Sequence, residues 1–203
     1  MLDDIFIFDN IISKEKQDIL EKYVKKENLK WIFANNISYF KSGDVFPQYV
    51  LPPTYEFDSN ILDIISEIEQ NVCIRLGRNF LKNYRFKINL LKVSDYEIAK
   101  PIQKGIHIDR NEEHISLVYY INDTDGSTSF YDFLGENVLD CVKYVDYGRY
   151  DKFKLVKEIP PKKGRVSVFN GMMPHHSNYP TINDRYVINI NLVIDKKLKT
   201  KLV

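Results

Sequence analysis

Residues 115–133 read ISLVYYINDTDGSTSFYDF and contain two β-type runs on either side of a turn. The runs Ile115–Ile121 and Ser127–Phe133 are rich in β-branched and aromatic residues, and the intervening Asn-Asp-Thr-Asp-Gly has the composition of a hairpin turn. Further runs of this kind are Arg85–Val93, Ile106–Asp109, Phe153–Ile159, Arg165–Phe169 and Tyr186–Ile194. Short strands in succession, separated by turn residues, predict a mainly β fold built as an antiparallel double-stranded β-helix, or jelly roll.

The first part of the chain predicts helices that support this barrel. One amphipathic helix is expected from Ser13 to Lys26, with Ser13 as the N-cap and Glu15 in the first turn. A second helix is predicted by apolar residues that recur on one helical face, namely Ile61, Ile64, Ile65, Ile68, Val72, Leu76 and Phe80. We therefore expect a single domain, 1–203, with mostly helical support in 1–83 on one outer face and the β-helix core in 84–196.

Composition narrows the class of partner. The chain has 203 residues, with 29 lysines and arginines against 28 acidic residues, so no net field attracts it to nucleic acid or to an anionic membrane. The N-terminus lacks a signal-peptide pattern, and no apolar stretch approaches the ~18 residues of a membrane span. Cys73 and Cys141 form no CxxC motif. These features predict a soluble cytoplasmic protein. They do not choose between a peptide, a protein and a small molecule as its partner, which must be inferred from the sites, and they leave the oligomeric state open.

The last predicted strand has two unlike faces. Alternation places a largely polar set and an apolar set on opposite sides, Arg185, Val187, Asn189 and Asn191 on the first and Tyr186, Ile188, Ile190 and Leu192 on the second. The polar face is either exposed to solvent or lines a ligand cavity inside the barrel, and the strand alone does not choose between these.

The four histidines include a group with metal-ligand spacing. In His107-Ile-Asp109 the histidine and the carboxylate are two residues apart at a strand end, so both point to one side and can reach one cation. A second histidine from the distant pair His175-His176 would complete a 2-His-1-carboxylate triad, which leaves positions open on a non-haem iron(II). Such tripeptides are common by chance, so the motif gains weight only from its context.

That context is an ordered series of motifs: His107-Ile-Asp109, Val118-Tyr-Tyr-Ile-Asn122, Asp125-Gly-Ser-Thr-Ser-Phe130, Gly164-Arg-Val-Ser-Val-Phe-Asn-Gly171, Pro174-His175 and Arg185-Tyr-Val-Ile-Asn189. It covers about half of the chain and resembles the prolyl-4-hydroxylase-like branch of the 2-oxoglutarate and iron(II)-dependent oxygenases. The resemblance implies iron(II) as the metal, 2-oxoglutarate as the co-substrate and ascorbate as an accessory cofactor. Adjacent residues of an extended segment face opposite ways, so only one of the paired histidines should bind iron, and the spacing from Phe169 and Pro180 favours His175.

The resemblance also implies residues for the co-substrate. Arg185 would bind the distal carboxylate of 2-oxoglutarate, because a planar guanidinium pairs with a carboxylate through two hydrogen bonds. Tyr120 would hydrogen-bond the same carboxylate, or is a core aromatic with a satisfied hydroxyl. Asn89 and Asn189 are weaker candidates for this pocket. Many relatives carry serine or threonine where this chain has Val187, so one expected hydrogen bond is missing.

The reaction expected from the resemblance is hydroxylation of a C–H bond in a second substrate, with a prolyl residue of a peptide or protein as the first candidate. The alternatives are a non-catalytic jelly-roll module that binds a ligand and a cupin metalloenzyme that does not use 2-oxoglutarate. Two segments, Leu134–Tyr150 and Pro101–Gly105, are predicted to be rim loops where substrate specificity would lie.

Overall fold

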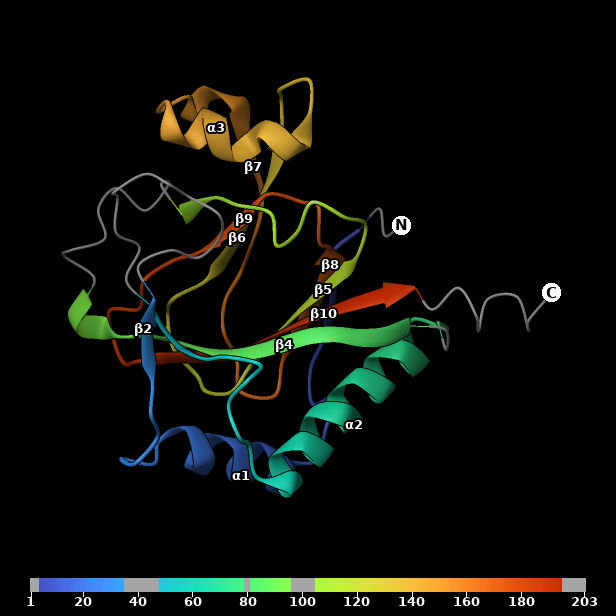
Figure 1. Cartoon of the computed structure of the whole chain (residues 1–203), viewed down its shortest axis with the longest axis vertical. Coiled ribbons are helices and arrows are strands. Elements are labelled where there is room, and N and C mark those ends of the chain that lie inside the picture. Colours follow the sequence, from blue (N-terminus) through green and yellow to red (C-terminus); the bar gives the residue numbers. More distant parts are fainter. Residues whose placement is uncertain (1–3, 35–47, 79–80, 96–104, 195–203) are drawn as a thin grey trace.

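The computed structural model describes residues 4–34, 48–78, 81–95 and 105–194 (Figure 1). Its strands are β1 Phe6–Phe8, β2 Ile32–Ala34, β3 Gln48–Leu51, β4 Leu81–Leu91, β5 Ile115–Tyr120, β6 Thr128–Phe133, β7 Phe153–Ile159, β8 Val166–Asn170, β9 His175–Ser177 and β10 Arg185–Ile194. They form a seven-stranded sheet in the order β1-β8-β5-β10-β4-β3-β2 and a three-stranded sheet in the order β7-β6-β9. The jelly-roll prediction is confirmed, since the paired strands are antiparallel and β8, β5, β10 and β4, which are distant in sequence, are neighbours in the larger sheet.

Two helices cover one face of the larger sheet (Figure 1). Helix α1 spans Lys14–Val24, and its N-cap Ser13 accepts a hydrogen bond from the Lys16 backbone N–H at 3.4 Å, as the sequence predicted. Helix α2 spans Ser59–Arg75 and buries the isoleucine stripe of its inner face. It ends before the predicted Phe80, because Gly77 adopts a left-handed φ of 62° that stops the helix. Phe80 itself lies outside the described residues.

Strand β10 lies between β4 and β5 in the larger sheet and separates two clusters of buried side chains. Its apolar face, which includes Ile188 and Ile190, packs with residues of α1 and α2 in the main core. Its other face contributes Val187 to a smaller cluster on the barrel side with Phe130 and Phe169. The polar face predicted for this strand is therefore directed into the barrel and is buried, so the exposed alternative is wrong.

The N-terminal part contains strands that the sequence did not predict. Strand β1 pairs with β8 at one edge of the larger sheet, and β2 and β3 extend the other edge from β4. Segment 134–150 also differs from a plain loop, since it contains helix α3 at Cys141–Asp146 and a 3-10 turn at Val138–Asp140. Most of Pro101–Gly105 lies outside the described residues. No helix in the described part has the length and apolar character needed to cross a membrane.

Candidate functional site

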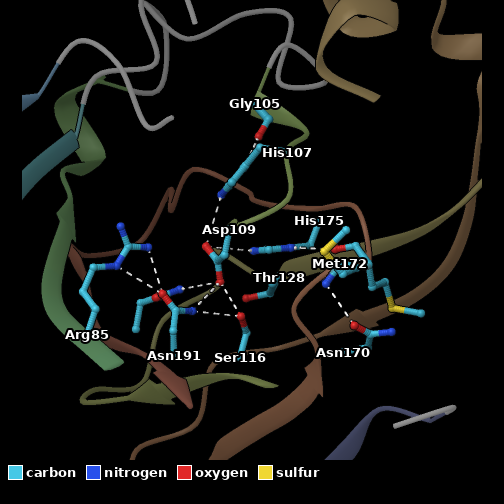
Figure 2. Close-up of polar contacts among 12 residues, drawn as sticks. Arg85, Gly105, His107, Asp109, Ser116, Thr128, Asn170, Met172, His175 and Asn191 are labelled. Carbon is cyan, nitrogen blue, oxygen red and sulfur yellow. Dashed lines mark hydrogen bonds and ion pairs between the residues drawn. The ribbon is translucent and has the colours of Figure 1, made fainter. Parts of the chain in front are cut away.

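Three side chains that could bind a metal converge in the barrel (Figure 2). Nε2 of His107 lies 3.8 Å from Oδ1 of Asp109, and Nε2 of His175 lies 3.9 Å from the same oxygen. The two imidazole rings are tilted with their centroids 4.6 Å apart. All three potential ligand atoms lie within 4.8 Å of one another, which is the arrangement a single cation requires.

A short stretch of backbone pairing creates this convergence. His107 and His175 form an isolated antiparallel bridge, in which the N–H of each donates to the carbonyl of the other at 3.0 and 2.9 Å. The sequence predicted a strand over Ile106–Asp109, but His107 forms only this isolated bridge. His175 is in β9, which pairs with β6 so that His175 lies opposite Phe130. The bridge sets the separation of the two rings before any metal binds.

The hydrogen bonds of both rings leave the same nitrogen free. Nδ1 of His107 donates to the carbonyl of Gly105 at 2.8 Å, and Nδ1 of His175 donates to the carbonyl of Met173 at 2.9 Å. In each ring Nε2 then carries a lone pair directed toward Asp109. Burial, with the neighbouring His175, lowers the pKa of His107 to about 3, so this ring is neutral, as a metal ligand must be.

The two oxygens of the Asp109 carboxylate have different surroundings. Oδ2 accepts hydrogen bonds from the Ser116 hydroxyl, from Nδ2 of Asn191 at 3.0 Å and from Nδ2 of Asn189 at 3.4 Å. Burial would raise the pKa of Asp109, but the two histidines, Lys87 and the Ser116 hydroxyl hold it well below its usual range. The carboxylate is thus ionised, with Oδ2 fixed by the protein and Oδ1 facing the two imidazoles.

Asn191 links this carboxylate to a cation behind it. Its Oδ1 accepts from Nη2 and Nε of Arg85 at 2.8 and 3.2 Å, and its Nδ2 donates to both Asp109 and Ser116 (Figure 2). Asn191 is fully buried, so the orientation of its amide is set by these partners. The residues present fit a divalent metal, because two imidazole nitrogens and one carboxylate oxygen are aimed at one point by supporting hydrogen bonds.

A cavity adjoins this group. Its lining comes from β3, β4, β5, β6, β9 and β10 together with the His107 segment, and consists of Gln48, Lys87, Asn89, His107, Asp109, Val118, Thr128, His175, Ser177, Val187 and Asn189. Two of the predicted co-substrate residues are therefore at the cavity wall: Asn189, which also bonds Asp109, and Asn89, whose buried Oδ1 has no hydrogen-bond partner.

Arg185 lies behind the wall of the cavity and is only 1% exposed. Its Nη2 donates to Oγ1 of Thr128 at 2.9 Å, and that oxygen is 2.7 Å from the hydroxyl of Tyr120. Its guanidinium carbon lies 5.5 Å from the centre of the Tyr120 ring. No carboxylate in the described part of the chain pairs with Arg185, and its Nε has no partner. A buried cation without a counter-ion is costly, so the site is suited to an anionic ligand.

His176 is directed away from the metal site. Its Nε2 lies 2.8 Å from Oδ1 of Asn178, and its ring stacks on Tyr131 with centroids 5.6 Å apart. Burial lowers the pKa of His176 to about 4, so it is a neutral packed side chain. The structure brings His175 and not its neighbour to Asp109, which agrees with the alternation expected of adjacent strand residues.

Several residues around the site were not singled out from the sequence. Thr128, Ser116 and Arg85 carry hydroxyl or guanidinium groups on strands whose pairing decides what they meet. Asn191 had a weak signal, because alternation placed it on the same face as Arg185. Lys87 had the same kind of signal on β4, where it faces the cavity.

Comparison with known proteins finds relatives in structure only. No family model matches the sequence, and no curated protein matches it. AviO1 from Streptomyces viridochromogenes Tue57 matches at a TM-score of 0.61 and 13% identity, covering 95% of this chain and 90% of that one. A prolyl hydroxylase from Trichoplax adhaerens, solved with a hypoxia inducible factor peptide fragment, matches at 0.58 and 15%, covering 97% and 86%.

A third structure is SnoK, a non-haem α-ketoglutarate-dependent carbocyclase from nogalamycin biosynthesis, with a TM-score of 0.60 and 12% identity over 97% of this chain and 85% of that one. α-Ketoglutarate is another name for 2-oxoglutarate. At these identities the likeness concerns the fold, which is also what the ordered sequence motifs indicated. The chain therefore has the jelly-roll fold of the 2-oxoglutarate and iron(II)-dependent oxygenases.

Proposed function

We propose that this protein is an iron(II)- and 2-oxoglutarate-dependent dioxygenase that hydroxylates a C–H bond of a second substrate. The observation that carries the proposal is one buried site with two parts: the group His107, Asp109 and His175, and the unpaired cation Arg185 behind the same cavity. A metal ion suits the first part and a carboxylate suits the second. 2-Oxoglutarate can join them, because it carries a 2-oxo acid at one end and a carboxylate at the other.

Each residue then has a defined role. His107, Asp109 and His175 hold the metal, and the hydrogen bonds to Gly105, Met173 and Ser116 fix the direction of their lone pairs. When bound, iron(II) supplies the activation of dioxygen that side chains cannot perform. One oxygen atom of O₂ enters succinate as carbon dioxide is released, and the other enters the hydroxylated product.

Arg185 and its neighbours hold the far end of the co-substrate. The guanidinium offers a planar set of donors to the distal carboxylate, and one hydroxyl of the bonded Thr128–Tyr120 pair adds a further donor. Val187 gives an apolar wall where related oxygenases often have a hydroxyl, and the Thr128 hydroxyl on the opposite sheet would replace it. Asn89 and Asn189 line the cavity on the side of the metal group and would act there.

The two alternatives account for less of the site. A non-catalytic binding module has no use for three lone pairs held toward one point, and a cupin that does not use 2-oxoglutarate has no use for a buried arginine without a counter-ion. For the second substrate, a prolyl residue of a peptide is one candidate, by analogy with the Trichoplax adhaerens protein.

An anaerobic titration tests the proposal. Protein loaded with iron(II) is titrated with 2-oxoglutarate while visible absorption is recorded, and we expect the metal-to-ligand charge-transfer band of the chelate. His107→Ala should remove the band by removing the metal, and Arg185→Ala should move it to much higher 2-oxoglutarate concentration. Iron binding without any such band would contradict the proposal and favour the cupin, whereas no iron binding would favour the binding module. Adding ascorbate to aerobic turnover tests that accessory cofactor.

A further inference from the structure

The two sides of the cavity differ in how many of their polar side chains are already hydrogen-bonded to other side chains. On the β5 and β10 side, Ser116, Asn189 and Asn191 all donate to Asp109. On the β3 and β4 side, Gln48, Lys87 and Asn89 line the cavity. None of these three makes a side-chain hydrogen bond or ion pair within the described part of the chain, and Oδ1 of Asn89 is buried without a partner. This second group is named the β3–β4 wall below.

The strand pairing places the β3–β4 wall beside the metal group. Asn89 lies opposite Val187 of β10, and Lys87 lies opposite Asn189, whose amide reaches Asp109. Because successive residues of β4 alternate, Lys87 and Asn89 share the inward face with Arg85. Lys87 is one of the groups that hold the pKa of Asp109 below its usual range, although the two side chains form no ion pair in the described part of the chain. The wall therefore presents one ammonium and two amides to whatever occupies the space next to the metal.

The co-substrate proposed above would reach this wall at most at Asn89 and would leave Lys87 and Gln48 free. Arg185 meets Thr128 of β6 and Tyr120 of β5, so a molecule that joins Arg185 to the metal group lies toward β5 and β6. In the larger sheet β4 and β3 follow on the opposite side of β10 from β5. If 2-oxoglutarate binds as proposed, the metal would neutralise its chelating end and Arg185 its distal carboxylate. Lys87 is a further cation that neither end needs.

We propose that the β3–β4 wall is the subsite for the second substrate and that this substrate presents a carboxylate to Lys87. This inference rests on the proposed function. The charges support it: the metal, Lys87, Arg185 and Arg85 together outweigh Asp109 and a dianionic co-substrate, and a substrate carboxylate would reduce this positive excess inside a poorly solvated site. Gln48 and Asn89 would bond the polar groups beside that carboxylate. A free amino acid or a similar small acid has this chemistry, and so does the acidic residue or C-terminus of a peptide.

Acetate is the simplest probe of this subsite, and acetamide is its neutral control. Each is added anaerobically to protein that holds iron(II) and saturating 2-oxoglutarate, and the broadening of its methyl proton signal by the paramagnetic iron is measured. We expect acetate, but not acetamide, to be broadened. Lys87→Met should weaken acetate binding by about tenfold or more, since the ammonium is lost from a partly buried pair. Lys87→Arg should restore most of it, and the exposed Lys154→Met should leave it unchanged.

The same titrations separate the outcomes. A charge-transfer band with no acetate effect, or an acetate effect that Lys87→Met leaves intact, would overturn the subsite while leaving the proposed function standing. A Lys87→Met protein that loses affinity for 2-oxoglutarate itself would assign Lys87 to the co-substrate and overturn it too. Absence of the band in wild type would instead reject the proposed function.

If Lys87→Met fails to fold, Lys87→Gln replaces it in the acetate titration.

In aerobic assays of succinate formation, stimulation by free amino acids points to a small acid as the second substrate, and stimulation by peptides with a free carboxylate points to a peptide. Equal stimulation by the uncharged amides of these compounds would overturn the proposal that the substrate presents a carboxylate to Lys87.

Discussion

The two faces of β10 are both buried, but one packs in the hydrophobic core and the other lines the candidate site. On the core side, Ile188 and Ile190 are fully buried among the helices and the larger sheet. On the cavity side, Arg185 is 1% exposed and Asn191 is 0% exposed, although both are polar. Burial alone therefore does not distinguish the part of the strand that stabilises the fold from the part that forms the site.

Hydrogen bonding does distinguish the two. Apolar side chains need no partner, so the core face is complete as it stands. On the cavity face Asn191 is satisfied by Arg85, Ser116 and Asp109, whereas Oδ1 of Asn189 and Nε of Arg185 are not. An unsatisfied buried polar group costs about 1–3 kcal/mol. We infer that the unsatisfied atoms mark where ligands bind and that the core face supplies the stability that permits them.

The largest effect is expected from the metal group that the cavity face supports. His107→Ala, Asp109→Ala and His175→Ala should each abolish tight iron(II) binding and 2-oxoglutarate turnover, because two ligands do not retain the ion. Calorimetry under anaerobic conditions measures the first and succinate formation the second, with circular dichroism to check the fold. His176→Ala is the matched control and should bind iron. Wild-type turnover by Asp109→Ala would remove this group from the site.

The next effect is expected at Arg185. Arg185→Ala should weaken 2-oxoglutarate binding by roughly 10²–10³-fold, from about 3–5 kcal/mol for breaking a buried pair, and spare the affinity for iron. Arg185→Lys should recover part of it, since the charge returns without the planar fork. Arg185→Met should leave the ligand-free fold as stable or more stable, because the residue it replaces has no counter-ion there. Unchanged 2-oxoglutarate affinity in Arg185→Ala would contradict the proposal that Arg185 binds the distal carboxylate of the co-substrate.

A smaller effect is expected at Asn191, which touches no ligand in the proposed site. Asn191→Ala removes a donor to Oδ2 of Asp109 and the acceptor for Arg85, so the carboxylate loses part of its orientation. Loss of such a supporting partner typically lowers metal affinity by about 10–100-fold. Iron titration measures this, with exposed Asn60→Ala on α2 as the control. Equal iron affinity in both variants would mean that Ser116 and Asn189 suffice to hold the carboxylate.

The sequence predicts the parts of this fold that have a periodic pattern. Strand β10 was predicted to within one residue, because its alternation extends over several residues, and residues 153–159 form β7 at the predicted bounds, because turn residues follow this run directly. Strands β1 and β2 have only three residues each, and they form because β8 and β3 offer them partners. Strand formation of that kind depends on tertiary pairing and leaves no local pattern.

The same division applies to the site. His107, Asp109 and His175 could be selected by residue type and spacing, and the alternation of β10 placed Arg185, Asn189 and Asn191 on one face. Strand order and register decide that Thr128 contacts Arg185, 57 positions away, and that Lys87 lies opposite Asn189, 102 positions away. The spacing of residues along the chain therefore does not predict which of these distant residues are in contact.

The smallest effect on the site is expected from the core face of the same strand. Ile190→Ala should lower the free energy of unfolding by about 2–5 kcal/mol, because a fully buried side chain is truncated where helices and sheet meet. That is a large part of the total stability of a domain, which is about 5–15 kcal/mol. Iron and 2-oxoglutarate affinities should nevertheless change by less than about twofold, since the backbone ladders to β4 and β5 hold Asn189 and Asn191 in place. Urea unfolding measures the first quantity and anaerobic titration the second. If Ile190→Ala kept its stability but lost affinity for either ligand, the two faces of β10 would not be separable, and the stability of the fold and the geometry of the site would have to be treated as one property.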